Sequence, residues 1–178
     1  MLFNSIALLW GFAEATFFFI VPDVWISLVA LSSLHDGLAA CGYSLIGAIL
    51  GGIIMYRWGK VDLKAANDFM VHIPAIRPKD IQEVRASLQK SGVFAVLLGP
   101  LLGIPYKIYA ANSSVVISIT SLALISVPAR VIRFLLIAFI TNKLSTTVMS
   151  QLSEVQKIER TIIFWVVFYS IYFFVKRK

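Results

Sequence analysis

Residues 11–31 read GFAEATFFFIVPDVWISLVAL, and this stretch decides the fold. Its apolar run is interrupted by the carboxylate of Glu14 and then by the pair Pro22 and Asp23. Proline removes a backbone donor and breaks a helix. A broken backbone at membrane depth is tolerated only where protein buries it or where it lines a wet cavity. We therefore predict a re-entrant helical hairpin over 1–34, with a kinked spanning helix as the alternative.

The composition of the whole chain supports a membrane setting. Of its 178 residues, 59% are hydrophobic and only 14% are charged, and the mean hydropathy is +0.86. Soluble domains are nearer to about 45–50% apolar and about 25% charged, so the composition excludes an ordinary soluble domain and a disordered chain. The net charge of +7 indicates positive-inside topology and anionic lipid headgroups rather than nucleic acid.

A second broken segment covers 92–111 and reads GVFAVLLGPLLGIPYKIYAA. Gly103 and Pro105 break it, and Lys107 follows at once. It has the same order of apolar leg, break, charge and apolar leg as 1–34. We predict a second re-entrant hairpin here, again with a kinked spanning helix as the alternative.

Three further segments are long apolar runs that we predict to be spanning helices: 38–56, 113–141 and 161–175. The chain is therefore predicted to be a single all-α membrane domain of two re-entrant hairpins and about three spanning helices. The order of hairpin and spanning helix occurs twice, and the two units begin on opposite sides of the membrane. This order leaves open an inverted-topology repeat.

The polar stretch 57–91 carries seven basic residues. Within it, 79–90 has apolar residues at helical spacing, which predicts an amphipathic surface helix. Positive-inside topology places 57–91 and the C-terminal sequence KRK in the cytoplasm. The stretch 141–160 is then external. The side of the N-terminus depends on whether 1–34 is re-entrant.

Five charges lie within the apolar segments: Glu14, Asp23, Lys107, Arg130 and Arg133. Such residues are expensive in a bilayer and usually mark a substrate or proton path. The three cations, two of them on one helix face, suit phosphate binding. The two carboxylates suit proton coupling. The alternatives are permanent ion pairs between these groups and cations that snorkel to the headgroups.

Other residues carry little chemical signal. His35 and His72 are isolated and lack metal-ligand spacing, and no nucleophile–base pair is evident, so we predict no metal, no cofactor and no enzymatic activity. Gly47 and Gly51 have the spacing of a close-packing face, which leaves open a homo-oligomer through this face.

Three stretches resemble the DedA family of membrane proteins, also called SNARE-associated or VTT-domain proteins. They are the hairpin 11–31 with its two acids, the glycine-rich helix 47–60 with Tyr56 and Gly59, and the second hairpin with its flanks, 88–113. The family's typical arginine after the hairpin glycine is replaced by Pro100, and Lys107 stands at the later basic position.

The resemblance implies a flippase or scramblase of phosphate-bearing lipids. Family members are linked to undecaprenyl phosphate and phospholipid handling, to the proton motive force and, in bacteria, to the inner (plasma) membrane. The predicted partners are accordingly membrane lipids, their phosphate headgroups and protons. The alternative functions are a proton- or ion-coupled transporter of a small soluble solute and an assembly protein whose charges are structural pairs.

Overall fold

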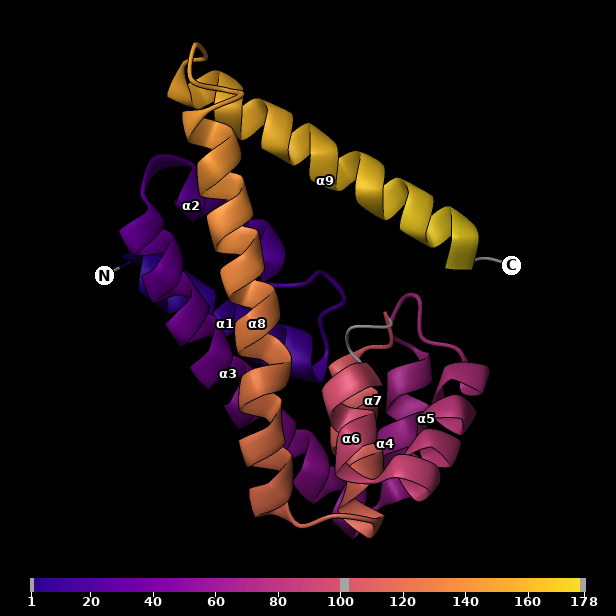
Figure 1. Ribbon diagram of the computed structural model, residues 1–178. Helices are drawn as coiled ribbons and strands as arrows, with labels where there is room; N and C mark the ends of the chain where they lie inside the picture. Colours follow the sequence, from indigo (N-terminus) through magenta and orange to yellow (C-terminus); the bar gives the residue numbers. More distant parts are fainter. Residues whose placement is uncertain (1, 100–102, 177–178) are drawn as a thin grey trace.

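The computed structural model describes residues 2–99 and 103–176, so Pro100 lies outside the described residues. Every described secondary-structure element is helical (Figure 1). Three helices are long and apolar enough to cross a membrane: α3 (Leu34–Val61), α8 (Ile119–Thr146) and α9 (Glu154–Lys176). The predicted helical class and number of long apolar helices are confirmed.

The segment 1–34, predicted as the first hairpin, contains two short helices, α1 (Leu2–Thr16) and α2 (Asp23–Ser32). A non-helical break separates them. The two helices are antiparallel. The indole of Trp10 donates to the carbonyl of Ile20 (3.0 Å), and that of Trp25 donates to the carbonyl of Phe3 (3.0 Å). Pro22 is the N-cap residue of α2 and Asp23 its first residue, so the acid lies at the positive end of a helix.

The glycine face of α3 receives α1 along its length. A Cβ atom at Gly47 would collide with the backbone carbonyl of Leu8, and one at Gly51 would collide with Phe12 and Ala15. Only a helix without side chains on this face allows such a close approach. The close packing predicted for these glycines is confirmed. Their partner is α1 of the same chain, so this face is not free for a second copy.

The polar stretch after α3 forms α4 (Leu63–Val71) and α5 (Pro78–Ser91). The predicted helix over 79–90 is present as α5, with its apolar face buried (Ile81, Val84 and Leu88). Arg85 donates to the side chain of Asn112 (3.0 Å), which also pairs with Asn67. These bonds join α4 and α5 to the helices that follow them.

The second broken segment contains α6 (Val93–Leu98) and α7 (Tyr106–Asn112). Between them, Gly103 has a φ of 82°, a left-handed conformation that glycine adopts without strain. Helix α7 packs on α3, where Gly52 faces the ring of Tyr106 and Gly59 faces Ala111. The helices α4 to α7 gather around one end of α3 (Figure 1).

A short 3₁₀ turn, η2 (Ser113–Val115), leads to α8. By sequence, Asn112, Ser113 and Ser114 are candidate caps of this helix, but its N-cap is Ser118, whose side chain accepts from Ser121. Pro128 lies within α8, which stays one helix. Helix α9 begins at Glu154, seven residues before the predicted 161–175. The prediction started too late because the first two turns of α9 are polar, and hydropathy does not detect them.

The two breaks meet halfway along the bundle. The α1–α2 pair approaches from the end where α3 begins, and the α6–α7 pair approaches from the end where α3 finishes. Their point of contact is a hydrogen bond of 2.7 Å from Lys107 Nζ, at the start of α7, to the carbonyl of Phe18 in the first break. This meeting point brings together the charges of the apolar segments.

Candidate functional site

The first acid–arginine pair joins α1 to α8. Arg130 Nη2 lies 3.0 Å from Glu14 Oε2, and the two side chains are 2% and 7% exposed. The guanidinium lies over the ring of Tyr106, 4.2 Å from its centroid. The hydroxyl of Tyr106 shares a 2.5 Å hydrogen bond with Ser126. This pair is sealed within the protein and links both breaks to α8.

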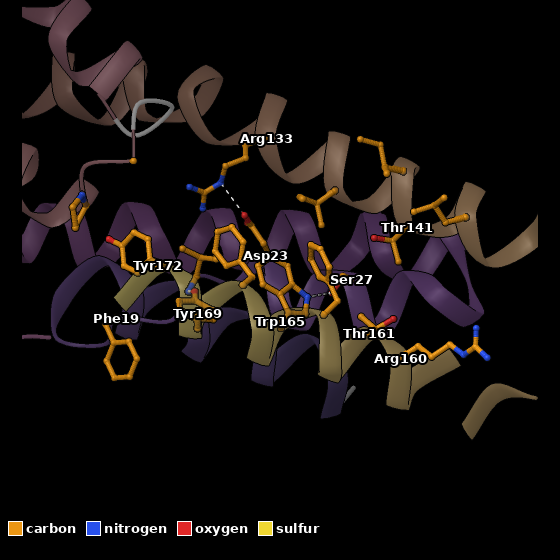
Figure 2. A pocket seen from close by; sticks show the side chains of 18 of the residues that line it. Phe19, Asp23, Ser27, Arg133, Thr141, Arg160, Thr161, Trp165, Tyr169 and Tyr172 are labelled. Atoms are coloured by element: carbon orange, nitrogen blue, oxygen red, sulfur yellow. Dashed lines mark hydrogen bonds and ion pairs between the residues drawn. The ribbon is translucent and has the colours of Figure 1, made fainter. Parts of the chain in front are cut away.

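The second acid–arginine pair joins α2 to α8, one helical turn further along. Arg133 Nε lies 3.2 Å from Asp23 Oδ2. The side chain of Arg133 is 23% exposed, about ten times the exposure of Arg130, whereas that of Asp23 is 8% exposed. Both residues line a cavity of about 650 Å³ (Figure 2). This pair is therefore accessible to a ligand.

Lys107, predicted as a phosphate ligand, lies at the second break as the sequence indicates, but away from the cavity that Asp23 and Arg133 line. Its ammonium group is committed to the carbonyl of Phe18, and the residue is only 1% exposed. Lys107, Glu14 and Arg130 are not among the described residues that line the large cavity. The structure thus brings the five charges to one level of the bundle and places Asp23 and Arg133 on the wall of the cavity.

Both pairs have unused hydrogen-bonding capacity. Each ion pair uses only some of the polar atoms of its two side chains. Within residues 2–99 and 103–176, the buried atoms that lack a hydrogen-bond partner include Asp23 Oδ1, Arg130 Nε and Arg133 Nη2. Buried polar groups in this state are costly. At the Asp23–Arg133 pair they are suited to a ligand with several acceptor oxygens.

The cavity lies between α8 and α9, with α2 at its base (Figure 2). Its lining is mainly aliphatic and aromatic, including Ile137, Ile140, Phe164, Phe168 and Tyr172. The predicted hairpin breaks also contribute, since Gly103 and Pro105 line it, whereas Pro22 caps α2 nearby. A charged pair on a mainly apolar wall suits an amphiphile.

Helix α9 supplies site residues that the sequence reasoning missed. Trp165 Nε1 donates to Ser27 (2.9 Å), and the hydroxyl of Tyr169 accepts from the backbone N–H of Val21 (2.8 Å). The cavity-lining residues of α9 follow one helix face: Arg160, Thr161, Phe164, Trp165, Phe168, Tyr169 and Tyr172. Their 3.6-residue periodicity is the signal that would have found this face.

The described residues contain no group of three or more His, Cys, Asp or Glu side chains placed to hold a metal ion. Comparison with models of known families, with curated proteins and with solved structures gave no significant match. The described residues form a helical protein with three helices long and apolar enough to cross a membrane and two acid–arginine pairs where two broken segments meet.

Proposed function

We propose that this chain is an integral membrane protein that moves phosphate-bearing lipids across the bilayer, as its resemblance to DedA proteins implies. The observation that carries the proposal is the Asp23–Arg133 pair on the wall of an apolar cavity. A guanidinium with free N–H groups binds a phosphate in bidentate fashion. The surrounding aliphatic and aromatic side chains accommodate the hydrocarbon part of the same molecule.

The apolar lining favours a lipid over a small soluble anion. A soluble anion loses its hydration on all sides when it enters a cavity, so its site needs polar groups around it. Here the charged groups are Asp23 and Arg133 at one place and Arg160 at another, separated by apolar residues. A polyprenyl phosphate or a phospholipid matches this segregation of charge and hydrocarbon.

In the proposed membrane orientation, both broken segments are re-entrant and their breaks lie near mid-depth. The stretch 57–91 and the C-terminus face the cytoplasm, as the basic residues predict. Lys176 lies 3.5 Å from Asp80 of α5, so the end of α9 lies beside the stretch 57–91. The turn between α8 and α9 is then on the external side.

The proposed mechanism is an exchange of partners at Arg133. In the absence of lipid, Arg133 pairs with Asp23. A phosphate that reaches Arg133 displaces the carboxylate, and the displaced Asp23 takes up a proton because an unpaired charge is unfavourable in this apolar setting. Return of the ion pair releases both the phosphate and the proton. Glu14 and Arg130, which are sealed, hold the two breaks together during this cycle.

The proposal is tested by transport in proteoliposomes containing the full chain. The probes are labelled polyprenyl phosphate, labelled phospholipid and labelled inorganic phosphate, each with and without a pH gradient. We expect movement of a lipid that is lost in Arg133→Gln and kept in Lys143→Gln, since Lys143 is a cation of α8 outside the cavity. Movement of inorganic phosphate alone would favour the soluble-solute alternative, and no movement by folded protein would contradict the proposal.

A further inference from the structure

The cavity extends from the Asp23–Arg133 pair to the end of the bundle where α8 turns into α9. Residues along this path are Ile137, Thr141 and Leu144 of α8, and Met149 in the turn. From Arg133 to Leu144 the helix rises about 16 Å, roughly half of the ~30 Å hydrocarbon core. The cavity therefore connects the level of the charged pair with one edge of the apolar layer.

A second arginine lines the cavity toward this outer end. Arg160 lies in the second turn of α9, and Figure 2 shows it with Thr161 and Thr141 at the end of the cavity remote from Arg133. Trp165, further along the same helix, donates from its indole to Ser27 of α2 and so fixes α9 beside the cavity. Arg160 lies at the outer end of the cavity, and its side chain extends away from the other lining residues (Figure 2).

Arg160 is exposed, and in the described part of the chain no carboxylate lies within ion-pairing distance of it. Its neighbour one turn earlier, Lys157, is already paired with Glu154 at 2.9 Å. Arg160 thus combines a free guanidinium, access to solvent and contact with an apolar cavity. The hydroxyl of Thr141 adds a hydrogen-bonding group at this end of the cavity, whereas that of Thr161 donates to the carbonyl of Lys157 (2.9 Å).

We propose that Arg160, with Thr141, is an outer binding site that captures the phosphate of a lipid headgroup before it passes to Arg133. The inference rests on the proposed function and names the entrance to the same site. The occupant is a lipid because the wall between the two arginines is apolar, so the hydrocarbon chain remains in contact with protein or bilayer throughout. The two arginines differ in burial and therefore in role, since Arg160 sets the rate of arrival and Arg133 sets the rate of release.

The test measures binding kinetics with full-length protein in detergent. The probe is a fluorescent phosphatidic acid, and the matching diacylglycerol, which lacks the phosphate, reports binding of the hydrocarbon alone. The variants are Arg160→Gln, Arg133→Gln and the control Lys143→Gln, which removes a cation at the same end of the bundle but outside the cavity. Association and dissociation rates are measured at low and at high salt.

We expect Arg160→Gln to slow association of phosphatidic acid about threefold at low salt, with the difference disappearing at high salt, because an exposed charge steers arrival and is screened. Arg133→Gln is expected to speed dissociation about tenfold, because its charge is buried. Lys143→Gln is expected to change neither rate, and none of the variants is expected to alter diacylglycerol binding.

Three other results would overturn the outer site, the proposed function or both. If Arg133→Gln weakens binding but Arg160→Gln associates like wild type, the outer site is wrong while the proposed function stands. The same holds if Lys143→Gln slows association as much as Arg160→Gln, since Arg160 then acts only as one more surface cation. If wild type binds phosphatidic acid no better than diacylglycerol, both the outer site and the proposed function fail.

Discussion

The two acid–arginine pairs differ in surroundings although their chemistry is the same. Glu14 and Arg130 are closed in by Tyr106. Arg133, one turn further along α8, and its partner Asp23 of α2 line a cavity of about 650 Å³. A sealed ion pair cannot exchange its partner without opening the protein. The comparison shows that the two pairs differ in burial rather than in residue type. One pair is closed off and joins helices, whereas the other can be reached by a ligand.

The largest expected effect comes from breaking the sealed pair. Arg130→Gln leaves the carboxylate of Glu14 buried without its cation, and removal of one member of a buried pair costs about 3–5 kcal/mol of folding free energy. Chemical unfolding in detergent measures this loss. The matched variant Arg133→Gln should lose clearly less, because its pair borders a cavity that water can enter. Equal losses in the two variants would remove the distinction between the pairs.

The next effect concerns function at the open pair. Asp23→Asn keeps the shape of the side chain but cannot exchange a proton, so we expect lipid movement driven by a pH gradient to fall at least about tenfold, the scale of an essential charged contact. Thermal unfolding verifies that the variant is folded. Asp36→Asn, which changes an exposed acid at the start of α3, is the control. Unchanged gradient dependence in Asp23→Asn would exclude proton exchange at this residue.

A third acid–base cluster, centred on Asp80 of α5, sharpens the comparison. Burial alone would raise the pKa of Asp80, but hydrogen bonds from Arg77 and the charges of Lys176 and Arg77 outweigh it, so the pKa lies below its usual value. A lowered pKa in the folded state stabilises the protein above the pKa of the unfolded state, and this stabilisation is lost as the pH falls through the folded-state value. We expect Asp80→Asn to cost about 1–2 kcal/mol near neutral pH.

That difference should shrink as the pH is lowered below about 4, where the carboxyl of the unfolded chain is protonated. Unfolding midpoints of wild type and Asp80→Asn across this range provide the measurement. The exposed pair Lys79–Glu83 on the same helix, at 3.5 Å, gives the control variant Glu83→Gln, which should change stability little. A constant difference at all pH values would mean that the charge of Asp80 is not responsible.

The smallest expected effect is at the contact between α9 and the first break. Tyr169→Phe removes the hydroxyl that accepts from Val21 and should lower the free energy of unfolding by about 0.5–1.5 kcal/mol. Hydrogen exchange at the Val21 amide should become faster. Tyr172→Phe, a change on the same cavity-lining face, is the control and should leave that amide protected. Unchanged exchange in Tyr169→Phe would show that α9 does not hold the break in place.

Both broken segments and all five charges of this region can be identified from the sequence. Proline and charge within an apolar run are local signals, so Pro22, Gly103 and Pro105 indicate where the helices break. Which acid pairs with which arginine is not a local property. It depends on how α8 is rotated against α1 and α2, and Arg130 and Arg133 look equivalent in sequence.

The part that α9 plays in the site is missed for a related reason. Hydropathy places its start at 161, because the charged residues of its first two turns resemble a loop. Arg160 then looks like a flanking cation, although it lies on the face of α9 that lines the cavity. The aromatic periodicity through Trp165 and Tyr169 indicates that face, but not its partner helix.

The most direct test removes each pair completely, so that no buried charge is left alone. Lipid translocation per folded protein, driven by a pH gradient, is compared for Glu14→Gln with Arg130→Gln and for Asp23→Asn with Arg133→Gln. The account predicts that the first double variant keeps most of the transport, because a sealed pair can be replaced by neutral groups, and that the second loses it. Loss of transport in the first with retention in the second would contradict the assignment of the working pair to Asp23 and Arg133.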